Sequence, residues 1–255
     1  MRRRTIIAGG LAGVLFAGFS TAAHAAEIKL ISAGAVRSVV SGLAETFARE
    51  SGHQVKAEYG TMGVVRQKLA ADPADVVIGS DTVLEDLIKQ GVIVAGTRAD
   101  VARAGVGVGV REGAPRPDIS TVEAFKQTLL SAKSIVYVDP AQGATSGIHF
   151  ASVLQRLGIA DAVKGKSLLW PGGYAAEAVA DGRAEVVVHQ ISEIMPVKGV
   201  TLVGPLPKEI QKVTIYSAGL AAKAASPEAG RAFIAYLTGP PIKAKFAAAG
   251  LDYKE

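Results

Sequence analysis

Gly105-Val-Gly-Val-Gly-Val-Arg111 and Val213-Thr-Ile-Tyr-Ser-Ala-Gly-Leu220 are two extended, apolar stretches with an alternating residue pattern. Neither stretch is connected to a neighbouring strand by a short helix. Elsewhere strand-like and helix-like segments alternate along the chain, which is typical of parallel βαβ units. The two stretches flank a block of about one hundred residues. If both cross between two lobes, that block is a second lobe inserted into the first, with a ligand cleft at the hinge. A single doubly wound sheet is the alternative.

The predicted architecture is α/β, with two Rossmann-like lobes joined by two crossing hinge strands. Residues 27–104 together with 221–255 form the first lobe, and residues 105–220, hinge strands included, form the second. Glycines in the first crossing strand ease bending or close packing. They do not form a dinucleotide loop, because position 110 is valine where that motif needs its third glycine, and no helix follows.

Periodic patterns define the other expected elements. The expected strands are Ile28–Ser32, Val55–Tyr59, Val76–Ile78, Ile135–Val138 and Val186–His189. The expected helices are Val36–Arg49, Val64–Leu69, Val83–Lys89, Val122–Leu130, Gly147–Leu157, Ala175–Ala180, Pro227–Leu237 and Ile242–Ala249. Glycine follows three of these helices, where it is favoured as a C-terminal cap.

The first 26 residues have the pattern of a secretory signal peptide. Arg2-Arg3-Arg4 is followed by the apolar stretch Ile6 to Phe19 and by Ala23-His24-Ala25, so cleavage is expected after Ala25 or Ala26. The route, Sec or twin-arginine, stays open. The expected location of the mature chain is the periplasm.

Removal of this leader changes the charge of the protein. The full chain carries 28 basic and 23 acidic residues, and loss of three arginines brings the balance close to neutral. No basic run of five or more residues occurs, so the sequence offers no nucleic-acid-binding face. The chain has no cysteine, which excludes a disulfide framework.

The segment from Ile135 to Phe150 combines a strand, a short loop and a helix start. The apolar run ends at Asp139-Pro140, and the loop ends in Thr145-Ser146-Gly147 before a helical pattern begins. A helix start presents unpaired N–H groups and the positive end of the dipole, so hydroxyls at this point predict a socket for a small anion. A plain N-cap is the alternative, since serine and threonine are favoured there without any ligand.

Several segments together resemble the type II periplasmic solute-binding proteins, nearest to the molybdate-binding branch of ABC importers. The segments are Ile31-Ser-Ala-Gly-Ala-Val36, Arg66 to Ile78, Val138-Asp-Pro, Ser146-Gly-Ile148, Lys198-Gly-Val200 and Pro205-Leu-Pro-Lys208. Their order and spacing match over nearly all of the mature chain. The resemblance implies two α/β lobes and an oxyanion held by hydroxyls and N–H groups at helix starts.

The resemblance and the chemistry of the residues themselves together indicate which residues bind the ligand. The expected ligand-binding set is Ala35, Val36, Arg37, Thr61, Thr145, Ser146 and Gln190, with Tyr174 as a cleft wall in the loop Trp170 to Tyr174. Ala35 stands where molybdate binders place a serine, and Ser146 adds a hydroxyl where they have alanine. The family's tyrosine falls on Gln190, or on His189 if the alignment slips by one.

Arg37 has no counterpart in the molybdate pattern. Arginine favours planar, bidentate partners such as carboxylates. A hydrogen bond to a charged group contributes about 1.5 to 3 kcal/mol against about 1 for a neutral one. The ligand is therefore either a tetrahedral oxyanion or a di- or tricarboxylate. A solvated first-turn side chain is the alternative interpretation of Arg37.

Two functions follow from these observations. The first is a monomeric periplasmic receptor that closes on a small anion and delivers it to an ABC permease, with no cofactor and no metal. The second is an enzyme on the same scaffold, since this branch also resembles periplasmic aconitate isomerase. That reaction needs a base close to a carbon next to a carboxylate. His189, His149 and Glu193 are the candidate bases.

Overall fold

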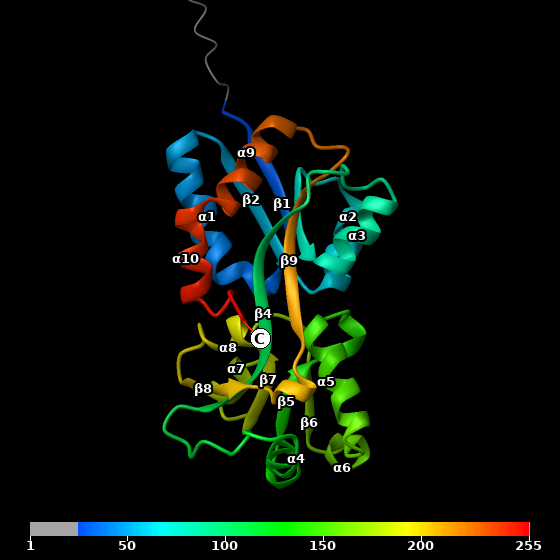
Figure 1. Ribbon diagram of the computed structural model, residues 1–255, viewed down its shortest axis with the longest axis vertical. Coiled ribbons are helices and arrows are strands. Elements are labelled where there is room, and N and C mark those ends of the chain that lie inside the picture. Colours follow the sequence, from blue (N-terminus) through cyan, green and yellow to red (C-terminus); the bar gives the residue numbers. More distant parts are fainter. Residues whose placement is uncertain (1–24, 255) are drawn as a thin grey trace, which may run out of the picture.

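The computed structural model describes residues 25–254. The molecule is elongated and has two α/β lobes joined by two long strands (Figure 1). The predicted leader, residues 1–26, falls almost wholly outside the described residues. No helix in the described part of the chain has the length and apolar character of a membrane span.

The first lobe contains the N-terminal strands and the two C-terminal helices. Strand β1 (Glu27–Ala33) pairs in parallel with β2 (Gln54–Gly60) and with β3 (Val76–Ser80). Its helices are α1 (Arg37–Ser51), α2 (Met62–Ala71), α3 (Asp81–Lys89), α9 (Pro227–Thr238) and α10 (Pro240–Ala248). The one-turn helix η1 (Gly34–Val36) precedes α1 directly.

The second lobe repeats the same layering. Strand β5 (Ile135–Val138) pairs in parallel with β6 (Ser167–Trp170) and β7 (Val186–Gln190), and β8 (Val200–Pro205) lies beside β4. Its α-helices are α4 (Val122–Ser131), α5 (Thr145–Arg156), α6 (Ala160–Lys164), α7 (Glu177–Ala180) and α8 (Ile191–Ile194). The 3-10 helices are η2 (Pro140–Gln142) and η3 (Lys208–Ile210).

Strands β4 (Ala99–Arg111) and β9 (Val213–Leu220) cross between the lobes, as Figure 1 shows. They pair antiparallel with each other, and β9 also pairs with β3 while β4 pairs with β7. The strand order β2-β1-β3-β9-β4-β7-β5-β6 is therefore continuous through both lobes. The two-lobe prediction is confirmed, and β4 begins at Ala99, earlier than the predicted Gly105.

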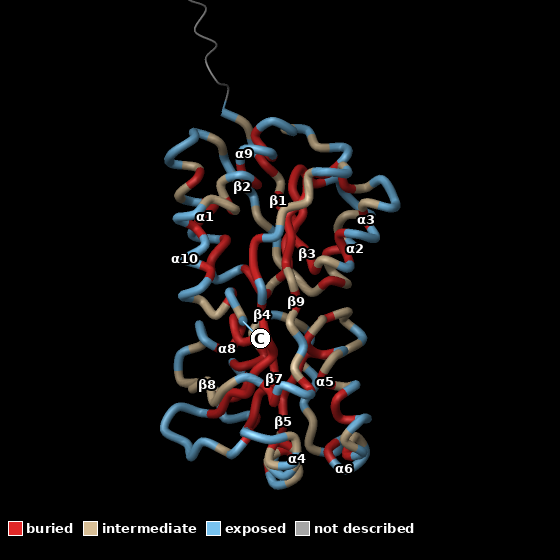
Figure 2. The backbone as a smooth tube through the Cα atoms, in the orientation of Figure 1, coloured by how far each residue is buried: buried red, intermediate tan, exposed pale blue. Residues whose placement is uncertain are grey.

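Buried residues form separate cores above and below this crossing (Figure 2). The core of the first lobe extends from Ile28 to Ala104 and resumes from Tyr216 to Leu251. The main core of the second lobe begins at Val106 and ends at Ile210. The exact lobe limits stay a prediction.

Candidate functional site

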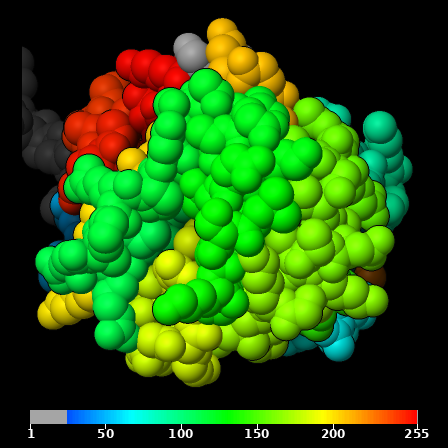
Figure 3. All heavy atoms as spheres, turned by 90° about the horizontal axis from the view of Figure 1, so that it is seen from below, coloured from blue at the N-terminus to red at the C-terminus, as the bar shows by residue number. Residues whose placement is uncertain are grey.

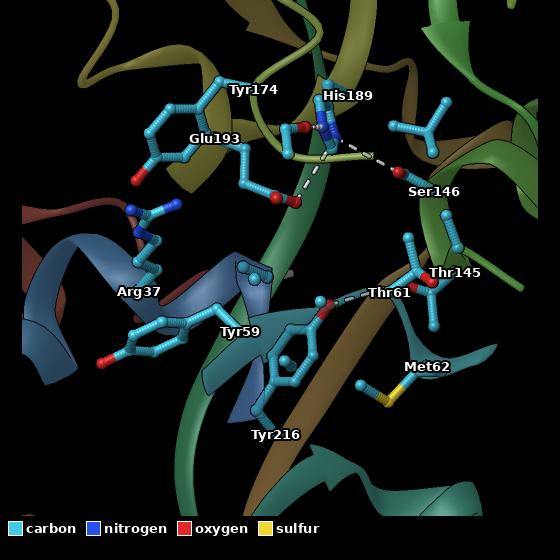
Figure 4. A pocket seen from close by; sticks show the side chains of 17 residues that line it. Arg37, Tyr59, Thr61, Met62, Thr145, Ser146, Tyr174, His189, Glu193 and Tyr216 are labelled. Atoms are coloured by element: carbon cyan, nitrogen blue, oxygen red, sulfur yellow. Dashed lines mark hydrogen bonds and ion pairs between the residues drawn. The ribbon is translucent and has the colours of Figure 1, made fainter. Parts of the chain in front are cut away.

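A cavity of about 70 Å³ lies between the two lobes. Figure 4 shows its side chains converging from both lobes and from β9. Polar and aromatic residues form most of its wall: Arg37, Tyr59, Thr61, Thr145, Ser146, Tyr174, His189, Glu193 and Tyr216. Ala33, Gly34, Ala35, Gly60, Met62, Val138, Ala144 and Gly173 complete it.

Arg37 is the first residue of α1 and lies at the exposed mouth of the cavity. Its guanidinium stands over the ring of Tyr59, 5.6 Å from the centroid, and Tyr174 lies on its other side (Figure 4). Burial raises the pKa of Tyr59 to about 12, and it also raises the pKa of Tyr174, so both rings stay neutral at physiological pH. The two rings hold a permanent positive charge at the entrance.

Thr61 connects the lobes in this structure. As the N-cap of α2 it accepts a hydrogen bond from the Val64 N–H at 3.3 Å. Its own hydroxyl donates to the carbonyl oxygen of Gln142, in the opposite lobe, at 2.5 Å. A hydroxyl has a single proton to donate. Thr61 therefore uses its donor on the second lobe in this closed arrangement, and not on an anion.

The start of α5 corrects one of the two interpretations of Thr145-Ser146-Gly147. The N-cap is Ala144, and no side chain makes a capping hydrogen bond there. Ser146 Oγ instead lies 3.2 Å from Nδ1 of His189, and Thr145 Oγ1 lies 3.3 Å from the Tyr216 hydroxyl. The N-cap interpretation of these two residues is wrong, because both are already inside the helix and face the cavity wall.

His189 and Glu193 form a buried pair at the back of the cavity. His189 is the last residue but one of β7, and Glu193 lies four residues later on α8, with Nδ1 of His189 3.4 Å from Oε2 of Glu193. Only 2% of His189 and 7% of Glu193 is exposed. Burial raises the pKa of Glu193, while a positive charge on His189 would lower it. A raised pKa makes the carboxylate form of Glu193 a stronger base than that of a solvent-exposed glutamate.

Three predicted residues do not line the cavity. Val36 is buried in the core of the first lobe. His149 points elsewhere: its Nε2 lies 2.8 Å from the carbonyl oxygen of Ile210, and burial lowers its pKa. Gln190 lies behind the wall, where its Nε2 contacts Thr145, Thr214 and Tyr216. His149 is therefore not placed to act on a ligand in the cavity.

Sequence reasoning missed Tyr59, Met62 and Tyr216. Tyr216 belongs to the second crossing strand, and a strand that passes between two lobes runs beside their cleft. That placement is the signal that could have identified it. Tyr59 is the last residue but one of β2 and lies at the carboxyl edge of the sheet, where ligands bind in open α/β folds. No cluster of three or more histidine, aspartate or glutamate side chains within residues 25–254 is arranged to hold a metal ion.

Two α/β lobes, two crossing strands and a polar cavity between them define the type II fold that periplasmic binding proteins share. The chain belongs to the bacterial extracellular solute-binding protein family, whose sequence profile matches residues 28–252. A Pseudomonas aconitate isomerase is 32% identical over 217 residues, covering 82% of this chain and 81% of its own.

Two further comparisons concern molybdate-binding proteins. The molybdate-binding protein of Azotobacter vinelandii is 29% identical over 246 residues, which cover 93% of this chain and 92% of that protein. A solved structure of an Azotobacter vinelandii periplasmic molybdate-binding protein superposes with a TM-score of 0.75 at 22% identity. It covers 89% of this chain and 100% of that one. That likeness establishes the fold.

Proposed function

We propose that this protein is a periplasmic isomerase of an unsaturated tricarboxylate of the aconitate type. The observation that carries the proposal is that Arg37 and the buried pair Glu193 and His189 line the same cavity. A proton transfer needs a group in the cavity that can accept and return a proton, and the Glu193 carboxyl is such a group, whereas binding of an oxyanion does not require one.

Each of these residues has a role in the proposed reaction. Arg37 binds one substrate carboxylate at the mouth, where its planar guanidinium offers two parallel donors. The hydroxyls of Thr145 and Tyr216 bind further carboxylate oxygens deeper in the cavity. This arrangement places the carbon chain of the substrate beside Glu193. The similarity to the Pseudomonas aconitate isomerase supports the same substrate class.

The proposed chemistry is a proton shift within one molecule. Glu193, as a carboxylate, removes a proton from the methylene carbon next to a substrate carboxylate. The electron pair of that C–H bond forms a new double bond, and the old double bond moves its electrons to the far carbon. Glu193 then returns the proton to that carbon. No atom or electron is gained or lost, and no cofactor takes part.

A second candidate function is solute delivery to an ABC permease. Membership of the solute-binding family and the similarity to molybdate-binding proteins favour it. In that case the protein acts as a monomer that carries a small anion, molybdate or a carboxylate, to a membrane partner. The hydroxyls at the start of α5 serve either function. The buried acid pair favours the isomerase.

The decisive experiment measures turnover and binding on the same samples. Purified mature protein is mixed with cis- or trans-aconitate in deuterated water and followed by proton NMR. We expect interconversion, with deuterium entering the exchanging carbon. Molybdate, tungstate and sulfate are tested alongside by thermal shift. Binding of these oxyanions alone, with no response to either aconitate, would contradict the proposal and leave the receptor function.

Two substitutions separate binding from chemistry. Glu193→Gln keeps the shape of the side chain but cannot accept a proton, so we expect kcat to fall about 100-fold or more with affinity within a few-fold. Arg37→Ala should instead weaken aconitate binding about 10-fold or more, which corresponds to loss of one charge-assisted contact. Arg66→Ala is the matched control, because Arg66 pairs with Asp86 on the surface. Unchanged kcat in Glu193→Gln would remove Glu193 from the chemistry.

A further inference from the structure

The backbone fixes the tautomer of His189. Its Nε2 lies 3.0 Å from the carbonyl oxygen of Gly173, and a carbonyl can only accept a hydrogen bond. Its Nδ1 lies 2.8 Å from the backbone N–H of Gln190, and an N–H can only donate. The neutral ring therefore carries its proton on Nε2, and Nδ1 presents a lone pair.

This tautomer decides which form of Glu193 fits beside the ring. Oε2 of Glu193 faces the same Nδ1 at 3.4 Å. An ionised carboxylate opposite a lone pair has no proton to share. The acid form does have one, and its O–H can donate to Nδ1 by sharing the ring lone pair with the Gln190 N–H. The Ser146 hydroxyl, 3.2 Å from Nδ1, can turn away because a hydroxyl rotates freely.

We propose that His189 is a positioning residue that strengthens Glu193 as a base, because its Nδ1 accepts a hydrogen bond from the acid form of Glu193. This inference rests on the proposed function, in which Glu193 accepts the substrate proton. A base is stronger when its protonated form is stabilised. In a site with little water, a hydrogen bond available to only one protonation state shifts the balance toward that state.

The arrangement differs from a Ser-His-acid triad. In such a triad the hydroxyl and the acid occupy opposite ring nitrogens, so that the ring takes a proton from the hydroxyl. Here Ser146 and Glu193 both face Nδ1, while Gly173 occupies Nε2. The histidine and the acid are therefore not arranged to take a proton from the Ser146 hydroxyl. The proton-transferring group is Glu193 itself.

Other groups face Glu193 from each element around it. Arg37 lies at the start of α1 and brings a permanent positive charge to the same cavity. Tyr174, from the loop before α7, and Tyr216, from β9, stay neutral because burial raises the pKa of both phenols. Gly34 presents backbone only, with Oε1 of Glu193 3.2 Å from where a Cβ would stand. Among the described residues that line the cavity, Arg37 is thus the permanent charge.

The test compares two substitutions of His189. Asparagine can place its side-chain oxygen near the position of Nδ1, where it accepts from the Gln190 N–H and from the acid form of Glu193. Leucine fills similar space without an acceptor. The readout is the pKa of the Glu193 carboxyl, followed by carbon NMR of ¹³C-labelled protein, with Glu193→Gln to assign the signal. Turnover is measured on the same variants as a function of pH.

We expect His189→Leu to lower the pKa of Glu193 by about one unit relative to wild type, and His189→Asn to stay within about 0.3 units. The acidic limb of the pH profile of kcat should shift to lower pH together with the pKa of Glu193. In His189→Leu, kcat on the plateau of that profile should fall several-fold. If His189 is instead a cation, its removal raises the pKa of Glu193. That opposite shift, or an equal loss in both variants, would overturn the proposal.

Nitrogen NMR of the His189 ring in the wild-type protein gives an answer that does not need turnover. A protonated Nε2 and an unprotonated Nδ1 at neutral pH are expected. A ring protonated on both nitrogens, or on Nδ1 alone, would overturn the inference even if the protein isomerises aconitate. The protein could show the expected tautomer of His189 and the expected pKa of Glu193 in the variants, and yet turn over no aconitate. That result would support the role of His189 and contradict the proposed function. The measurements therefore distinguish failure of the His189 inference from failure of the proposed function. Because the nitrogen NMR uses the wild-type protein, it tests the inference even if His189→Leu does not fold.

Discussion

Gln190 lies behind the cavity and influences how several hydroxyl groups at its wall are oriented. Its side-chain Nε2 lies within 3.2 to 3.4 Å of the hydroxyl oxygens of Thr145, Thr214 and Tyr216. The amide nitrogen carries two N–H groups, which only donate, so two of these three oxygens act as acceptors at a time. Their own protons then remain available to donate. In this way one buried amide turns the inner wall of the cavity into a donor surface, which suits an anion.

A substitution at Gln190 tests this orientation effect. Gln190→Glu places a carboxylate, which accepts from the hydroxyls and so removes their donors from the cavity. We expect the affinity for an anionic ligand to fall about 10-fold or more, measured by calorimetry. Thr214→Val is the matched control, because Thr214 shares the network but does not line the cavity, and it should change the affinity less than about 3-fold. Equal affinity in Gln190→Glu and wild type would contradict the argument.

Some residues of the site could be predicted from sequence and others could not. Arg37, Thr145 and Ser146 follow the carboxyl ends of strands, so a strand–loop–helix pattern was enough to place them at the cleft. Tyr59 and Tyr216 lie inside strand patterns, where a tyrosine fits a core position equally well. The pairing of His189 with Glu193 depends on how β7 continues into α8. That short helix carries no periodic pattern of its own.

At the scale of elements, the packing of α5 against β5 depends on one glycine. A Cβ on Gly147 would collide with the carbonyl oxygen of Val138, and the residue lies in the first turn of α5. Because no side chain fits there, the helix start can approach the end of the strand closely. This approach brings Thr145 and Ser146 to the cavity. The sequence motif Thr145-Ser146-Gly147 thus combines two hydroxyls with the residue that positions them.

Gly147→Ala should therefore disturb both stability and binding. We expect a loss of about 1 to 3 kcal/mol in the free energy of unfolding, because the helix must move away from β5. That loss lowers the melting temperature of a domain of this size by about 2 to 12 °C. Gly165→Ala is the matched control, since that glycine has right-handed backbone angles and open space around it. Differential scanning calorimetry that finds the two variants alike would refute the packing argument.

The sequence predicted most elements but missed two strands. Val213–Leu220 was predicted with the bounds that the structure has, because its alternation is continuous and its flanks are clear. Strands β6 and β8 escaped detection because they are short and not deeply buried. Leu168 and Leu169 on β6 are both exposed, so that strand shows no alternation between an apolar and a polar face. The local sequence pattern predicts a strand poorly where pairing with distant strands determines that the segment is extended.

At the scale of the whole molecule, the lobes touch across the cleft through backbone. A Cβ on Gly63 would meet the carbonyl oxygen of Gln142 at 2.5 Å, and a Cβ on Gly143 would meet the Gly63 nitrogen at 2.8 Å. Thr61 donates to the same carbonyl oxygen. We call these four residues the interlobe contact. Close approach of the lobes depends on the absence of side chains at this contact.

Gly63→Ala should hold the lobes apart without unfolding either of them. We expect a larger radius of gyration in small-angle X-ray scattering with ligand present and a weaker affinity, while thermal stability without ligand changes little. Gly42→Ala is the matched control, because that glycine lies in the exposed middle of α1 with open space around it. If Gly63→Ala closes on its ligand as wild type does, the contact does not limit closure.

The position of β9 in the sheet also has a consequence for the order in which the chain folds. β9 is inserted between β3 and β4, and the core of the first lobe includes Tyr216 to Leu251. A chain that emerges with its N-terminus first therefore presents β1, β2 and β3 long before their neighbour exists. The second lobe has its whole core by Ile210 and can fold earlier. Until β9 arrives, the apolar edge of β3 stays unpaired, and an unpaired edge is where strands of other molecules attach. The half of the protein that is made first is thus completed last.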